Sequence, residues 1–128
     1  MEKIEVSTEP VVFTIQILSN LLANAIKFSD FNQTIEIRAQ KENQKVLIEI
    51  INLCDKSVDY KKIFEGSFVG ESHSGTSGER GFGLGLFIAR GQCQRLGIDL
   101  QGTCKKISDE NFESNVSLLV PGAAKETL

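Results

Sequence analysis

The order of the strand-like runs constrains the fold of this chain more than any other feature of its sequence. The runs come as two pairs, Thr34–Ala39 with Lys45–Asn52 and Ile98–Lys106 with Phe112–Val120, and the polar turn Gln40–Gln44 separates the first two. Runs rich in Ile, Val and Leu on both sides of a short polar turn predict antiparallel hairpins. Strands that arrive as hairpins favour an α+β fold, a two-layer sandwich in which helices cover one face of a mixed, mostly antiparallel sheet.

A long amphipathic helix is predicted ahead of the first hairpin. Ser7 or Thr8 can cap its N-terminus, Glu9 and Pro10 suit its first turn, and the helical pattern continues to about Phe28. At about 100° per residue, one arc of this helix is apolar and should face the core. That arc consists of Val11, Ile15, Leu18, Leu22, Ala25 and Ile26.

A second helix is predicted at Leu84–Leu96, and Gly97 can end it in a left-handed conformation. Residues 66–81 precede this helix and read GSFVGESHSGTSGERG, which contains too few apolar side chains to pack on its own. We therefore expect one mobile loop there, with His73 as an ordinary exposed loop residue.

Composition and charge narrow the class of protein. A chain of 128 residues with 41% hydrophobic side chains has the size of a single domain, here residues 1–128, with one core. Acidic and basic residues are mixed along the chain and give a net charge of −3, which argues against a nucleic-acid or membrane-binding patch. The three cysteines fit a reducing, cytoplasmic compartment, and we expect them to pack as small apolar residues. No apolar stretch reaches the roughly 20 residues that span a bilayer, so any membrane anchor of the parent protein should lie outside this chain.

A polar stripe follows the first helix on the arc nearly opposite its apolar residues. Gln16, Asn20, Asn24 and Lys27 share this arc. Carboxamide oxygens a turn apart suit a cation such as Mg²⁺, and a lysine one turn further can meet a phosphate. Ordinary exposed amides on a solvated helix face would give the same pattern, so this segment alone leaves the two interpretations level.

A glycine-rich turn leads from the loop into the second helix. Free backbone N–H groups and the positive end of a helix can receive phosphate oxygens there, because glycine allows a close approach of the backbone. Glycines also precede helices for steric reasons alone, so the turn is a weak signal when taken by itself. The turn consists of Gly81, Phe82, Gly83, Leu84 and Gly85.

Both polar segments resemble motifs of one family. The run NLLANAIKF at Asn20–Phe28 resembles the N box of histidine kinase ATP-binding domains, and GFGLGLFIAR at Gly81–Arg90 resembles their second glycine box. Residues Ile63–Glu65 with Phe68 look like the F box, and Leu119–Pro121 resembles the closing strand. The resemblance covers nearly the whole chain and implies a Bergerat α/β sandwich of the GHKL ATPase superfamily, shared by histidine kinases, gyrase, mismatch-repair ATPases and a heat-shock chaperone.

The resemblance also implies cofactors and residue roles. The cofactors would be ATP and Mg²⁺, with Asn20 as the metal ligand and with Asn24, Lys27 and the glycine box on the phosphates. Phe64 would line the nucleotide site, and residues 66–81 would form the ATP lid.

Gln16 lies where the hydrolysing relatives place a catalytic glutamate. An amide cannot take a proton from water, which favours phosphotransfer to a protein over hydrolysis. Gln16, Asn20 and Lys27 are thus the expected catalytic set. The partner implied by the resemblance is a dimerisation and histidine-phosphotransfer domain of the same kinase, which serves a response regulator indirectly.

One motif of the family is altered. The family carries an Asp-x-Gly-x-Gly box whose aspartate accepts a hydrogen bond from the adenine amino group, whereas residues 51–56 read INLCDK. Alignment of the strand places Asn52 at the adenine-reading position, and Asp55 is the alternative reader. Without the glycines, larger side chains such as Leu53 stand where the adenine would lie.

Three functions therefore compete. The first is the ATP-binding catalytic domain of a two-component sensor histidine kinase. The second is a degenerate, non-catalytic relative that acts as a protein-interaction module, favoured by the altered box. The third is a free-standing serine kinase of the anti-sigma-factor type, which the wording of the N box and F box makes the weakest.

Overall fold

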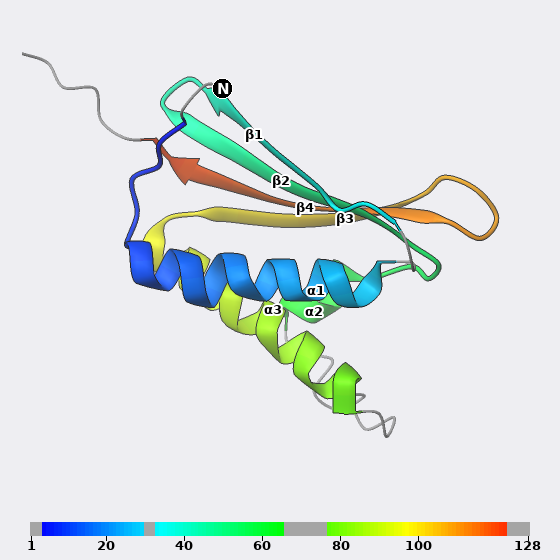
Figure 1. The fold of residues 1–128 in the computed structure, drawn as a ribbon. Coiled ribbons are helices and arrows are strands. Elements are labelled where there is room, and N and C mark those ends of the chain that lie inside the picture. The colour runs from blue at the N-terminus through cyan, green and yellow to red at the C-terminus, as the bar shows by residue number, and fades with distance from the viewer. Residues whose placement is uncertain (1–3, 30–32, 66–76, 123–128) are drawn as a thin grey trace, which may run out of the picture.

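The computed structural model describes residues 4–29, 33–65 and 77–122, with residues 77–83 described by their backbone alone. Two helical segments come first, followed by two strands, two helices and two strands (Figure 1). Their bounds are η1 Val12–Leu18, α1 Ser19–Phe28, β1 Glu36–Glu42, β2 Lys45–Cys54, α2 Tyr60–Phe64, α3 Ser77–Leu96, β3 Asp99–Lys106 and β4 Phe112–Pro121.

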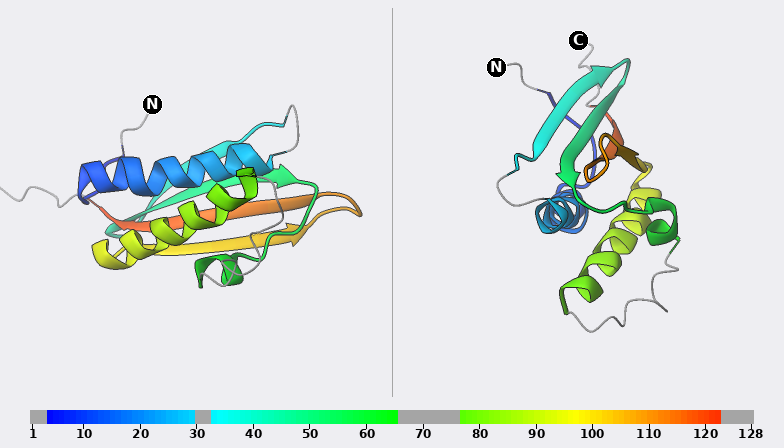
Figure 2. Two further views of the ribbon diagram at one scale, coloured as in Figure 1. Left: turned by 90° about the horizontal axis from the view of Figure 1, so that it is seen from below. Right: turned by 90° about the vertical axis from the view of Figure 1, so that its right-hand side faces the viewer.

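The four strands form one antiparallel sheet in the order β1-β2-β4-β3. The helices all lie against one face of the sheet, as the two rotated views make plain (Figure 2). Both predicted hairpins are present within three residues of their expected bounds, and the turn of the first narrows to Asn43 and Gln44, with Asn43 at φ 59°. The expected α+β sandwich with a mostly antiparallel sheet is confirmed.

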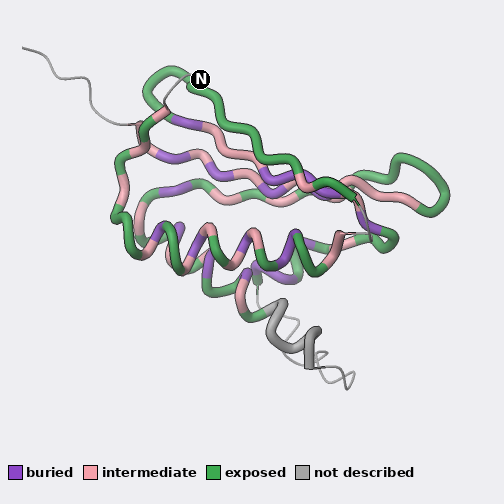
Figure 3. Tube along the Cα trace, viewed as in Figure 1, coloured by how far each residue is buried: buried purple, intermediate pink, exposed green. Residues whose placement is uncertain are grey.

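The core lies between the sheet and the helices (Figure 3). Burial alternates along β4, whereas three successive residues of β2, Ile50 to Asn52, are buried. Val46 and Ile50 of β2 and Val116 and Leu118 of β4 point into this layer because successive side chains of a strand face opposite sides. The cysteines pack as expected, without disulfides: Cys54 and Cys93 are buried and Cys104 is half-buried.

The first helix exists as predicted, but a different residue caps it. The carboxylate of Glu9 accepts hydrogen bonds from the backbone N–H groups of Val11 and Val12, at 3.2 and 2.7 Å. Ser7 instead donates its backbone N–H to the Pro121 carbonyl at 2.8 Å, as part of the β-bridge that joins the N-terminal segment to the end of β4. Glu9 therefore performs the role that the sequence suggested for Ser7 or Thr8.

The predicted core arc of this helix is wrong. Val11, Ile15 and Ile26 are 61%, 62% and 67% exposed, Leu18 and Leu22 are half-buried, and of that arc only Ala25 is buried. A second apolar set at four-residue spacing faces the core, namely Phe13, Ile17, Leu21 and Ala25. Residues 12–18 form a π-helix, which turns by less than 100° per residue. Residues four apart therefore lie closer to one line along the helix than the prediction assumed.

The second long helix begins earlier than expected. α3 starts at Ser77 rather than Leu84, so the last five residues of the expected loop are helical, while residues 66–76 lie outside the described residues. Glycine costs a helix only about 1 kcal/mol per residue, and no proline interrupts the segment. Its end is as predicted: Gly97 has φ 74°, and Ile98 donates its backbone N–H to the Cys93 carbonyl at 2.8 Å.

The short helix α2 was not foreseen from the sequence. Asp59 caps it by accepting a hydrogen bond from the backbone N–H of Lys62 at 3.2 Å.

Within the described part of the chain, no helix is both long enough and apolar enough to cross a membrane.

Candidate functional site

Helix packing brings the polar stripe of the first helix against α3. The Gln92 amide donates from Nε2 to Oε1 of Gln16 at 2.6 Å. Two turns earlier on α3, a Cβ built on Gly85 would lie 3.2 Å from Oδ1 of Asn20. The stripe and the glycine box, far apart in sequence, therefore meet in one contact between antiparallel helices.

Asn20 is held in a defined orientation at this contact. Its Nδ2 donates to the backbone carbonyl of Gln16 at 2.7 Å, and its Oδ1 faces the bare backbone of Gly85. The residue is half-buried. A neutral oxygen with available lone pairs is a ligand that Mg²⁺ accepts, and Mg²⁺ usually combines one or two protein ligands with phosphate oxygens and water.

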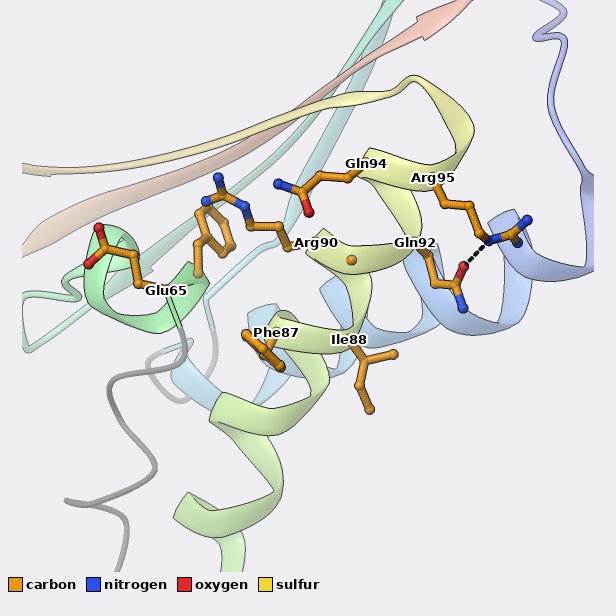
Figure 4. Close-up of a pocket in the computed structure, with 9 residues that line it drawn as sticks. Glu65, Phe87, Ile88, Arg90, Gln92, Gln94 and Arg95 are labelled. Atoms are coloured by element: carbon orange, nitrogen blue, oxygen red, sulfur yellow. Dashed lines mark hydrogen bonds between the residues drawn. The ribbon is translucent and has the colours of Figure 1, made fainter.

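Gln16 is fixed by a chain of side-chain hydrogen bonds. Gln92 donates to Gln16 and accepts, at its own Oε1, a hydrogen bond from Nε of Arg95 at 2.8 Å (Figure 4). Gln92 was not predicted from the sequence, although its position seven residues after Gly85 places it on the same face of α3. The amide of Gln16 is thereby committed to positioning α3, and it offers no base.

Two buried amides lack partners. Asn24 is 8% exposed and Asn52 is 4% exposed, and the Nδ2 atom of each has no hydrogen-bond partner among the described residues. A buried donor left unpaired costs about 1–3 kcal/mol, so such groups generally serve a ligand or a functional contact. α1 and β2 run in the same direction, which puts both residues toward one end of the sandwich (Figure 1).

Asn52 lies beside a buried hydroxyl pair. It points to the helix-covered face of the sheet and is the cross-strand partner of Ser114, whose Oγ is hydrogen-bonded to Oη of Tyr60. Burial raises the pKa of Tyr60 to about 12, although its bond to Ser114 acts in the opposite sense. Tyr60 and Ser114 were not predicted from the sequence, because neither belongs to a recognised motif.

Tyr60 packs on a bare part of strand β3. A Cβ on Gly102 would come within 2.5 Å of Cγ of Tyr60, so only glycine fits there. The ring of Tyr60 also lies 5.8 Å from that of Phe64, centroid to centroid.

The other predicted site residues lie in varied settings. Lys27, in the last turn of α1, and Asp55, just after β2, are both exposed. Phe64 is buried in the core, with the guanidinium carbon of Arg90 5.5 Å from its ring centroid. Leu84 is 50% exposed on α3.

The glycine box lies inside a helix rather than at its start. Because α3 begins at Ser77, the four backbone N–H groups without a helical partner belong to residues 77–80. The expectation that Gly81, Phe82 and Gly83 present free N–H groups at a helix N-terminus is therefore wrong for this conformation, and their side-chain positions lie outside the described residues. Gly85 contributes to the contact with Asn20 because it has no side chain.

A groove of about 540 Å³ runs along the exposed side of α3. Phe64 and Glu65 border it from α2, and Phe87, Ile88 and Arg90 border it from α3 (Figure 4). Phe87 and Ile88 are 44% and 41% exposed, and Leu84 continues this apolar strip by one turn. The strip offers an apolar surface next to the Asn20–Gly85 contact.

Residues 11–123 match the family described as "Histidine kinase-, DNA gyrase B-, and HSP90-like ATPase". The chain belongs to this family. The match takes in the Asn20 stripe, the altered box around Asn52 and the glycine box of α3, which confirms the resemblance drawn from the motifs.

Two proteins similar to this chain are a sensor protein and a sensor histidine kinase. "Sensor protein KdpD" of Clostridium acetobutylicum is 32% identical over 103 residues, which cover 79% of this chain and 11% of that protein. The chain thus spans only about a tenth of that relative's length. The solved structure of "Mycobacterial sensor histidine kinase MprB" superposes with a TM-score of 0.62 at 19% identity, covering 83% of this chain and 68% of that one, and it supports the fold.

Proposed function

We propose that this chain is the ATP-binding catalytic domain of a two-component sensor histidine kinase. The observation that carries the proposal is the contact between Asn20 and Gly85. The oriented Oδ1 of Asn20 faces a residue without a side chain, and a Cβ built on Gly85 would lie 3.2 Å from that oxygen. A family membership alone would leave gyrase-like and chaperone-like ATPases open. A relative at 32% identity is named as a sensor protein, which favours the sensor kinase.

The residues fit ATP and Mg²⁺. Asn20 would hold Mg²⁺ through Oδ1, Asn24 and Lys27 would contact phosphates, and Asn52 or Asp55 would read the base. The Nδ2 atoms of Asn24 and Asn52, which have no partner among the described residues, would supply donors for such a ligand. Bound Mg²⁺ supplies charge neutralisation on the phosphates, and the chain's own residues supply position.

The amide at Gln16 favours phosphotransfer over hydrolysis. It is hydrogen-bonded to Gln92 and has no basic atom to accept a proton from water. The γ-phosphoryl group would then pass to a histidine of another domain. The domain would act in the cytoplasm, whether or not the parent protein is anchored in a membrane.

The strip Leu84, Phe87 and Ile88 with its groove is the surface that we assign to that partner. A dimerisation and histidine-phosphotransfer domain presents helices, and an apolar strip along a helix suits an amphipathic helix as partner. The response regulator would be served indirectly.

One observation favours the second function, a degenerate interaction module. β2 continues as a paired strand through Leu53 and Cys54, and Cys54 is buried beside its cross-strand partner Phe112. The family carries glycines there, which would leave more room for a base than a paired strand does.

Calorimetric titration separates the two functions. Wild type is titrated with ADP and with a non-hydrolysable ATP analogue, with and without Mg²⁺, beside Asn20→Ala. Binding that depends on Mg²⁺ and is lost in Asn20→Ala supports the kinase domain. Absence of binding at millimolar nucleotide would leave the interaction module.

A further inference from the structure

At the position of Asn52 the family carries an aspartate, whose carboxylate differs in chemistry from an amide. It is 4% exposed, and its Nδ2 has no partner among the described residues. Its cross-strand neighbour Ser114 is occupied by the hydroxyl of Tyr60. A buried donor is thus left for a ligand, at a position where a carboxylate would offer acceptors only.

The hydroxyl pair beside Asn52 is uncharged at neutral pH. Tyr60, whose pKa is raised to about 12 by burial, stays protonated at neutral pH, and the two other titratable groups that act on it are the thiols of Cys54 and Cys104. Cys54 is buried and follows Asn52 on the same face of β2. No charge on the hydroxyl pair therefore favours a ligand that donates a hydrogen bond over one that accepts it.

A carboxamide can pair with two different purine edges. Toward 6-aminopurine, Oδ1 accepts from the amino group and Nδ2 donates to the ring nitrogen N1. Toward 6-oxopurine, the amide turned by 180° donates from Nδ2 to the oxygen and accepts at Oδ1 from the N1–H. A carboxylate facing position 6 accepts from the amino group and repels the oxo group.

We propose that Asn52 makes the base site accept 6-oxopurine nucleotides as well as 6-aminopurine nucleotides. The inference rests on the proposed nucleotide-binding function and specifies its substrate class. The chain would be a purine-nucleotide domain with weak discrimination at position 6 of the base, in place of a strict adenine reader.

The test uses ADP and inosine diphosphate, which differ in the 6-substituent and the N1 proton. Both are titrated calorimetrically with Mg²⁺ into wild type, Asn52→Asp and Asn24→Ala. Wild type should bind the two within about 5-fold of each other, and Asn52→Asp should disfavour inosine diphosphate by about 10-fold or more relative to ADP. Asn24→Ala, at a proposed phosphate contact, should weaken both and leave their ratio unchanged.

The outcomes separate the two proposals. Binding of ADP with inosine diphosphate more than about 30-fold weaker in wild type would overturn the inference and keep the proposed function. Binding of neither nucleotide would overturn both. The wild-type ratio decides the question even when Asn52→Asp does not fold, since it needs no variant.

Discussion

Replacing Gly85 with alanine should weaken nucleotide binding and leave the stability of the fold nearly unchanged. The new Cβ would lie 3.2 Å from Oδ1 of Asn20, which is tighter than normal contact, so the Asn20 side chain must move by a few tenths of an ångström. Mg²⁺ demands nearly ideal octahedral geometry with bonds of about 2.0–2.1 Å, so this displacement should weaken Mg²⁺-dependent ADP binding by about 10-fold or more. Alanine also adds about 1 kcal/mol of helix propensity to α3, which offsets the steric cost.

Gly91→Ala is the matched control, because it lies on the same helix and its Cβ would meet nothing within 4 Å. It should gain the full propensity term, about 1 kcal/mol or about 4 °C in Tm for a chain of this length, with unchanged ADP affinity. Calorimetry with Mg²⁺ and thermal melts of both variants give the comparison. If Gly85→Ala bound ADP as wild type does, Asn20 would not be the metal ligand and the reasoning from this contact would fail.

Three further changes test other parts of the structure. Gln16→Glu should create ATP hydrolysis about 10²-fold above wild type, since a carboxylate can activate water, and a phosphate-release assay that shows no increase would argue against a base role at this position. Gly102→Ala should lower the free energy of unfolding in urea by about 1–3 kcal/mol, because its Cβ would overlap the Tyr60 ring at 2.5 Å; a wild-type midpoint would contradict this packing. Burial raises the pKa of Tyr60 from 10 to about 12 and that of Cys93 from 9 to about 12, so the stability tied to these neutral groups is complete below pH 9 and should fall as pH rises toward 12. Urea midpoints across this range should fall less steeply in Tyr60→Phe and in Cys93→Ala than in wild type, and an unchanged slope in both would refute the assignment.

The sheet could be predicted closely because its signals are local. Alternating apolar residues and a polar turn define each hairpin, and Gly97 ends α3 as its position suggests. The family motifs could be located for the same reason, since each is a contiguous run.

The helix faces could not be predicted, because they depend on which neighbour covers each arc. The first helix carries two apolar arcs, and the sequence does not show that Asn20 and Gln16 pack on α3 and leave Ile15 outside. The start of α3 was missed because glycine lowers helix propensity without forbidding a helix. Tyr60 and Ser114 were missed because a tertiary hydrogen bond between distant residues leaves no local pattern.

The site gathered by this fold is built from amides and contains few charges. On the proposed function, Asn20, Asn24 and Asn52 meet a polyanionic ligand with neutral groups, and Lys27 is the cation among the proposed contacts. Neutral amides bind a divalent cation more weakly than carboxylates do. Mg²⁺ should therefore bind together with the nucleotide, whose phosphate charge it neutralises, and should not bind to the protein beforehand. The same neutrality removes the electrostatic repulsion that a carboxylate at position 52 would direct at a base oxygen, so weak metal affinity without nucleotide and broad purine tolerance follow from one cause.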